Sequence, residues 1–139
     1  RTISKHQARK IERQVEAANV LETAADMVTT TLVEAAEHRI RAQFLVSAAT
    51  IEKISTLHAM ALQAFKDALQ DYSLEQQDPD TDLAKNQFKD ELQNVRLYLV
   101  ERLSDTDKNR IEIYRFESEV LEGIRRLHAL ARRLKRKAG

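Results

Sequence analysis

The sequence contains no cysteine, one proline and two glycines among its 139 residues. Without cysteine, disulfides, thiol nucleophiles, thiolate zinc sites and iron–sulfur clusters are excluded. The turns of a β-sheet depend on glycine and proline, which make up about 7% and 5% of average sequences. Their scarcity therefore predicts long helices joined by few loops.

Net charge and long apolar runs are missing as well. Lys+Arg number 23 and Asp+Glu 22, which leaves a net charge of +1 and argues against strong overall attraction to nucleic acid or anionic membrane. No apolar run approaches the roughly 20 residues of a membrane span, and no signal peptide is visible. The size and the 42% hydrophobic content predict a single domain over 1–139. Because the chain starts at Arg1 and not at methionine, we expect it to be a fragment of a larger protein.

Apolar residues at helical spacing are what the sequence does contain. One stripe, with steps of three and four, runs from Ile11 to Ala35, and another runs from Ile40 to Tyr72. The step of five between the stripes puts them out of phase, which predicts a kink or tight turn at 36–39. A single rod over both stripes would reach roughly 100 Å, too long for a compact domain of this size.

The rest of the chain predicts a loop and two further helices. The segment 73–81 contains the only proline, Pro79, and is expected to be a loop. A second break at 104–107 precedes the most regular heptad of the chain, from Ile113 to Leu134. We therefore predict an all-α antiparallel bundle. Its four long helices are expected at about 3–36, 38–72, 82–103 and 106–135.

Two pairs of side chains at helical spacing could hold a metal ion. Glu22 and Asp26 would lie one turn apart on a helix face and offer oxygen ligands to a hard or borderline cation, although acidic pairs at this spacing are common on solvated faces. Glu34 and His38 have the same spacing and a nitrogen–oxygen donor set, with a surface pair as the alternative. His58 falls on the second apolar stripe and is expected to be hydrogen-bonded in the core or at an interface.

The last predicted helix ends in a cluster of cations, with no acid after Glu122. An anion or a membrane surface would face a basic patch of Arg132, Arg133, Lys135, Arg136 and Lys137. Phosphate, anionic lipid or nucleic acid are its conceivable ligands. Because cations suit the C-terminal end of a helix dipole, a solvated helix end is the alternative. His128, earlier in the same helix, is expected near the bundle surface or a helix seam.

Catalytic motifs are not recognisable in the sequence. It has no GxSxG elbow, no phosphate-binding loop and no GxGxxG turn. Its serines and threonines fall largely within predicted helices, without a nucleophile–base arrangement. We therefore predict that the chain is not an enzyme.

Two segments resemble a known family. Residues 17–28, Ala-Ala-Asn-Val-Leu-Glu-Thr-Ala-Ala-Asp-Met-Val, resemble the signature helix of PhoU-like domains. Residues 116–131, Phe-Glu-Ser-Glu-Val-Leu-Glu-Gly-Ile-Arg-Arg-Leu-His-Ala-Leu-Ala, are similar to the last helix of the PhoU-like region of bacterial sodium/phosphate cotransporters. The resemblance implies a cytosolic PhoU-like regulatory domain of such a membrane protein, located on the cytoplasmic side of the cell membrane. A full PhoU has two three-helix repeats, so part of the first repeat would lie upstream.

The resemblance also implies a metal site and partners. The Glu-x-x-x-Asp metal motif of the family falls on Glu22 and Asp26, which would hold a divalent or iron-type ion. Between them, 23–25 read Thr-Ala-Ala where the family has Arg-Ile-Gly, and at the second motif Glu122 is expected to pair with Arg125 instead. The implied partners are the transmembrane part of the same chain or a transporter, a second copy in a homodimer, and phosphate or anionic lipid.

Two other functions stay open. The first is a self-associating helical interaction module without a ligand, which would use the heptad of the last helix as a coiled-coil seam. The second is a nucleic-acid-binding helical domain, which only the basic C-terminal end favours. Nucleic acid is the less expected partner because the chain as a whole is nearly neutral.

Overall fold

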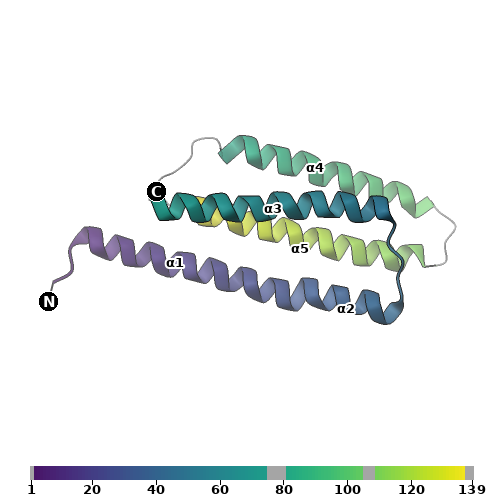
Figure 1. The fold of residues 1–139 in the computed structure, drawn as a ribbon, viewed down its shortest axis with the longest axis horizontal. Helices are drawn as coiled ribbons and strands as arrows, with labels where there is room; N and C mark the ends of the chain where they lie inside the picture. The colour runs from purple at the N-terminus through teal and green to yellow at the C-terminus, as the bar shows by residue number, and fades with distance from the viewer. Residues whose placement is uncertain (1, 75–80, 105–108, 137–139) are drawn as a thin grey trace.

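The computed structural model describes residues 2–74, 81–104 and 109–136, which are helical almost throughout and contain no strand. The first rod joins, without a break, α1 (Lys5–Met27), the π-helical turn η1 (Val28–Leu32) and α2 (Val33–Ala42). The other three rods are α3 (Ala48–Leu74), α4 (Thr81–Glu101) with the 3₁₀ turn η2 (Arg102–Ser104), and α5 (Arg110–Arg136) (Figure 1). The predicted all-α architecture with four long helical rods is confirmed.

α5 is the central helix. Consecutive rods run antiparallel, and α5 lies beside the first rod, α3 and α4 (Figure 1). Its heptad is buried from one end to the other, with Ile113, Ile124 and Leu134 at most 5% exposed. The apolar face that the sequence marked most strongly is therefore the core of the bundle. The alternative function, a self-associating module with this heptad as its seam, stays a prediction, although in this bundle the heptad packs within the chain.

The largest cluster of the core joins α1, α3, α4 and α5. Leu57 of α3 and Leu99 of α4 are at most 1% exposed and pack in the same cluster as Leu121 of α5 and Met27 of α1. Smaller clusters add contacts of the first rod on either side of this region, through Ala17 and Ala35. The first rod is thus part of the core. Among the described residues, no helix is long and apolar enough to cross a membrane.

The first rod ends later than the sequence predicted. Gln43 makes the turn, in the left-handed conformation with φ of 57°. The amide of Phe44 donates to the carbonyl of Arg39 at 3.1 Å, and the amide of Gln43 donates to that of Ile40 at 3.3 Å. These are the two hydrogen bonds of a Schellman motif. The predicted kink at 36–39 is therefore wrong, because those residues continue the helix α2.

A π-helical turn also shifts the phase of the first rod. The hydroxyls of Thr29 and Thr30 donate to carbonyls four residues earlier, at 3.0 and 2.8 Å, and such bonds compete with the helix's own ladder. Gly123 of α5 lies against this turn, where an added Cβ would come within 2.6 Å of Leu32 Cδ2. Glycine therefore lets α5 approach η1 closely.

The stripe predicted to be buried on the first rod mostly faces outward. Ile11 is 50% exposed, Val15 54%, Leu21 39% and Val28 40%, so that prediction is wrong for most of its length. The side that packs against the bundle consists instead of Ala17, Val20, Ala24, Met27 and Ala35. Small residues fill most of this contact, and a periodic pattern of large apolar residues gives no sign of them.

The remaining bounds differ by a few residues. α3 extends to Leu74 and α4 starts at Thr81, so residues 73, 74 and 81 of the predicted loop are helical, and 75–80 lie outside the described part. α5 begins at Arg110, later than the predicted 106, and 105–108 also lie outside it. In the second stripe Ala61 and Ala68 are buried as predicted, whereas Ile40 and Ile51 are exposed.

Candidate functional site

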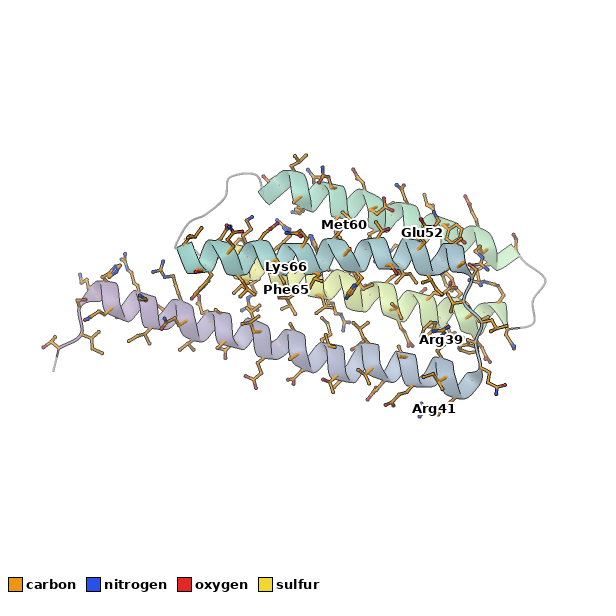
Figure 2. All side chains as sticks on the ribbon, in the orientation of Figure 1. Arg39, Arg41, Glu52, Met60, Phe65 and Lys66 are labelled. Carbon is orange, nitrogen blue, oxygen red and sulfur yellow. The ribbon has the colours of Figure 1, made fainter. Side chains whose placement is uncertain are left out.

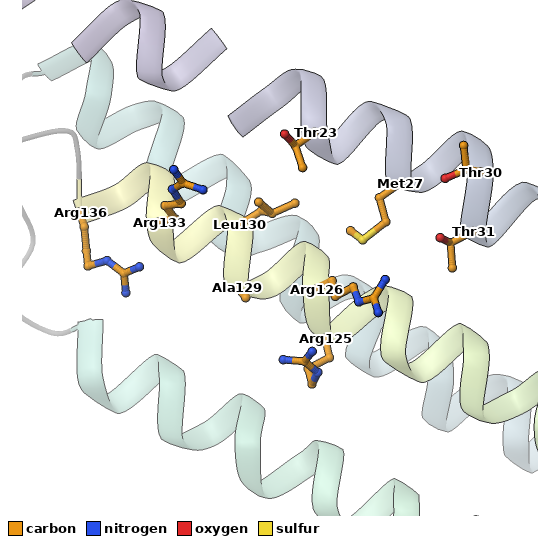
Figure 3. Close-up of a pocket in the computed structure, with 10 residues that line it drawn as sticks. All are labelled: Thr23, Met27, Thr30, Thr31, Arg125, Arg126, Ala129, Leu130, Arg133 and Arg136. Carbon is orange, nitrogen blue, oxygen red and sulfur yellow. The ribbon is translucent and has the colours of Figure 1, made fainter. Parts of the chain in front are cut away.

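A groove of about 600 Å³ lies between the first rod and the C-terminal half of α5 (Figure 3). Figure 3 shows residues of the two rods facing each other across it. The first rod contributes Thr23, Met27, Thr30 and Thr31, and α5 contributes Arg125, Arg126, Ala129, Leu130, Arg133 and Arg136. We call this the basic groove.

The positive charge of the basic groove comes from one face of α5. Arg126 and Arg133 are seven residues apart, which is close to two helical turns, and both are exposed. Arg136 follows Arg133 by three residues and lies in the last turn, where the helix dipole favours cations. The groove therefore carries guanidinium groups at intervals along its length.

One acid partly balances this charge at the inner end. Glu122 binds Arg125 at 2.6 Å and lies 3.4 Å from the Arg126 Nε. The hydrogen bond from Arg125 is the main reason why the pKa of Glu122 is lowered from its usual value. The predicted pair of Glu122 with Arg125 is thereby confirmed. At the outer end, Arg133 and Arg136 are eleven and fourteen residues away from this acid along α5.

Apart from its arginines, the groove is mainly apolar in character. The hydroxyl of Thr23 donates to the carbonyl of Asn19, and that of Thr30 to the carbonyl of Asp26, both at 2.8 Å. These hydroxyl protons are therefore engaged within their own helix. Met27 of the first rod and Leu130 of α5 add apolar side chains. The arrangement suits an anion with a less polar part beside its charged group.

The basic patch predicted from the sequence divides into separate environments. Arg133 and Arg136 line the basic groove. Lys135 lies 3.3 Å from Asp71 of α3, and both side chains are largely buried. This ion pair joins the C-terminal ends of α3 and α5. Lys135 is therefore a structural contact and does not line the groove.

Two other members of the predicted patch lie elsewhere. Burial is the main cause that lowers the pKa of Arg132, and Arg136 adds to it, whereas Asp82 of α4 acts in the opposite direction. Arg132 is thus close enough to Asp82 to feel its charge, and it does not line the basic groove. Lys137 lies outside the described residues. Sequence reasoning missed Arg125 and Arg126 as groove residues, although the seven-residue step from Arg126 to Arg133 was a usable signal.

The predicted metal ligands lie on the surface of the first rod. Glu22 and Asp26 are both exposed on α1. In the part of the chain that the structure describes, no three His, Cys, Asp or Glu side chains gather where they could hold a metal ion. Glu34 and His38 are exposed on α2, and the His38 ring meets Phe44 edge-on at 5.4 Å between centroids. Metal binding at Glu22 and Asp26 stays a prediction.

His58 and His128 have opposite environments. His58 is exposed and borders a second, apolar groove between α1 and α3. His128 is 6% exposed and stacks on Phe88 of α4, with ring centroids 3.8 Å apart and planes at 4°. Burial, helped by Arg132, lowers the pKa of His128 to about 4. The expected position at a helix seam is confirmed for His128, although it is buried there.

Comparison with known proteins gives no relative: no protein-family model matches the chain, and no curated protein or solved structure matches it. The resemblance to PhoU-like domains therefore stays a prediction. The chemistry that the structure itself offers is an arginine-lined groove on one side of α1 and an apolar surface on the other.

Proposed function

We propose that the chain is a helical regulatory domain that binds a phosphate-bearing anion in the basic groove. The observation that carries this proposal is the set of arginines that line a groove whose other lining is mainly apolar. Guanidinium groups bind phosphate through paired, charge-assisted hydrogen bonds. Met27 of the first rod and Leu130 of α5 would contact the less polar part of the ligand.

Binding would act on the docking of the first rod. The groove is formed by α5 on one side and by α1 and η1 on the other, so a ligand that touches both sides favours the docked arrangement. A ligand shifts such an equilibrium by the difference in its affinity for the two states. The domain would in this way convert anion binding into a change in the position of its first rod.

The resemblance to PhoU-like domains gives this proposal a biological setting. The chain would lie on the cytoplasmic side of the cell membrane and regulate a sodium/phosphate cotransporter-like protein through contacts with its transmembrane part. Free phosphate and the phosphate of an anionic lipid headgroup share the chemistry that arginines recognise. The experiment must therefore distinguish these two sources.

The test compares inorganic phosphate and pyrophosphate, measured by calorimetry, with phosphatidylglycerol vesicles, measured by co-sedimentation. Arg126→Glu/Arg133→Glu should weaken binding by roughly tenfold or more. The matched control is Arg41→Glu/Arg115→Glu, which makes the same charge change at exposed positions away from the groove; Figure 2 shows Arg41 at the far end of the first rod. Binding in only one arm identifies the source of the phosphate.

Two outcomes contradict the proposal. Equal losses in the groove variant and the control variant would show that binding follows net charge alone. No binding of phosphate, pyrophosphate or vesicles by the wild-type chain at low salt would remove the groove as an anion site. Circular dichroism of both variants establishes that the helices are intact in either case.

A further inference from the structure

The outer side of α1 carries an apolar stripe that the described part of the bundle leaves exposed. Large residues along it are 39–54% exposed, and the alanines between them are exposed too. We define the outer stripe as Ile11, Val15, Ala18, Leu21, Ala25 and Val28. Steps of three and four residues keep these positions on one face of a helix. This is the pattern of a helix that packs against another helix.

The outer stripe continues into the apolar groove between α1 and α3. This groove measures about 350 Å³, and Leu127 of α5 is among its lining residues. On the α3 side, Leu62 is 47% exposed and Leu69 46%. The two helices are well separated, since no Cα atom of α1 comes within 8 Å of one in α3. The apolar surface therefore spans two helices.

The area of this surface is large for a monomer. Each half-exposed aliphatic side chain presents roughly 100 Å² of surface. The outer stripe and its α3 neighbours therefore present on the order of 500 Å² of apolar surface, which is near the upper end for the largest patch of a typical monomer. A standard interface buries about 800 Å² on each partner. The alanines and the polar flanks would supply the remainder.

Charge along the first rod is divided between its two ends. Residues 5–13 contain four Lys or Arg and one acid, whereas residues 16–37 contain five acids and no Lys or Arg. A second copy that runs antiparallel places the basic segment of each chain beside the acidic segment of the other. A parallel copy would place like charges together, which is unfavourable.

We infer that a second copy of this chain covers the outer stripe, with α1 of each copy antiparallel to α1 of the other. The pair is centred between Ala18 and Leu21, which sets Ile11 level with Val28. The same surface serves both copies, as a two-fold interface requires. Residues 2–12 are all exposed, and the first turns of α1 project past the ends of the other helices in Figure 1. This projecting end would lie along the partner.

The dimer does not depend on the proposed anion site. Thr23, Met27 and Thr30 of the basic groove occupy a different side of α1 from the outer stripe. Failure of one proposal therefore leaves the other standing. A dimer that forms without phosphate supports the interface alone.

The oligomeric state tests the interface, by sedimentation equilibrium over a range of concentrations. Val15→Glu/Leu21→Glu places charge in the outer stripe at positions that are already exposed, so the fold is retained. We expect its dimer dissociation constant to rise at least about 100-fold. The matched control, Leu97→Glu/Ile111→Glu, alters two exposed apolar residues elsewhere and should leave the dimer unchanged.

Cysteine cross-linking tests the antiparallel register, because the chain has no cysteine of its own. In this register Ile11 lies level with Val28 of the other copy, and both belong to the outer stripe. Oxidation of Ile11→Cys/Val28→Cys, followed by mass spectrometry of the linked peptides, should give a link between positions 11 and 28. A parallel pair would give links between like positions instead.

Three results would overturn the inference. A wild-type chain that is monomeric at concentrations on the order of 100 μM has no such interface. A dimer that the control variant disrupts and the stripe variant does not must use another surface. Links between like positions, 11 with 11 or 28 with 28, would show that the helices do not pair in the antiparallel register.

Discussion

Helices α1 and α5 carry similar apolar patterns but differ in how far these patterns are buried. The heptad of α5 is buried along its length, whereas the outer stripe of α1 is largely exposed. α5 buries even charged groups: Arg110 and Glu117 pair with each other at 4% and 0% exposure. α1 docks on the bundle mainly through alanines such as Ala17 and Ala24. A regular apolar stripe thus predicts that a face will be covered, but not that the same chain will cover it.

The difference follows from the number of neighbours. α5 packs against the first rod, α3 and α4. Among the described helices, the backbone of α1 comes close to that of α5 but not to that of α3, which α1 reaches through side chains. The helix with close neighbours on several sides holds the bundle together. The helix with fewer close neighbours borders both proposed binding surfaces, the basic groove that it shares with α5 and the outer stripe.

The largest expected effect is a loss of stability, and it is tested by truncating one leucine on each of the two helices. Leu121 of α5 is 2% exposed and Leu21 of α1 is 39% exposed. Leu121→Ala should lower the free energy of unfolding by about 2–5 kcal/mol, because it leaves a cavity in the core. Leu21→Ala should cost less than about 1 kcal/mol. Urea denaturation of dilute protein, followed by circular dichroism, measures both; equal losses would show that Leu21 is as much a part of the core as Leu121.

The loss of folding stability in acid should also come from a residue of α5. His128 has a pKa of about 4 in the folded protein and 6.5 as its ordinary value. Because folding lowers this pKa, its contribution to stability is complete above pH 6.5 and is lost as the pH falls toward 4. The loss amounts to about 2 kcal/mol by pH 5. We expect wild-type protein to lose this much relative to His128→Phe, which keeps an aromatic ring against Phe88.

The comparison with His128→Phe is needed because the titration of Glu117 changes the stability of the fold in the opposite direction. Burial raises the pKa of Glu117, against the effect of Arg110, so its contribution favours folding as the pH falls. The difference between wild type and variant cancels this contribution. Unfolding free energies measured at pH 7 and pH 5 in both proteins give the result. Parallel curves over this range would mean that His128 titrates normally.

The parts of the fold that were predictable depend on local chemistry. Scarce glycine and proline, with apolar residues at helical spacing, sufficed for four long helical rods. The end of the first rod was misplaced because Gln43 adopts the left-handed conformation that glycine usually takes. The π turn at Val28–Leu32 contains three threonines, which are weak helix formers, but no residue type in it is specific to a π turn.

The site was predictable only where it lies on one helix. The pair of Glu122 and Arg125 spans three residues and follows from helical geometry. The basic groove joins residues about 100 positions apart, such as Thr23 and Arg126, and no periodicity in one segment reveals that contact. The ion pair of Lys135 with Asp71 likewise needed the packing of α3 on α5.

The smallest effect probes the contact between the two helices themselves. Gly123→Ala should gain up to about 1 kcal/mol from helix propensity, but its Cβ would meet Leu32 Cδ2 at 2.6 Å and Cγ at 3.3 Å. The end of Leu32 is flexible and has to move aside, so we expect a net change within about 1 kcal/mol. Leu32→Ala removes the obstacle. In that background Gly123→Ala should show its full stabilisation.

The double-mutant cycle of Gly123→Ala and Leu32→Ala isolates this contact. A coupling of about 0.5–1 kcal/mol in the free energy of unfolding is expected, because the two residues touch. Ala35→Gly offers a matched change on the same rod away from Gly123, and its cycle with Gly123→Ala should show coupling near zero. If the Leu32 cycle is also additive, the first rod adjusts its distance from α5 without cost. In that case the packing at Gly123 does not fix the distance between the first rod and α5. A ligand bound in the basic groove would then determine this distance.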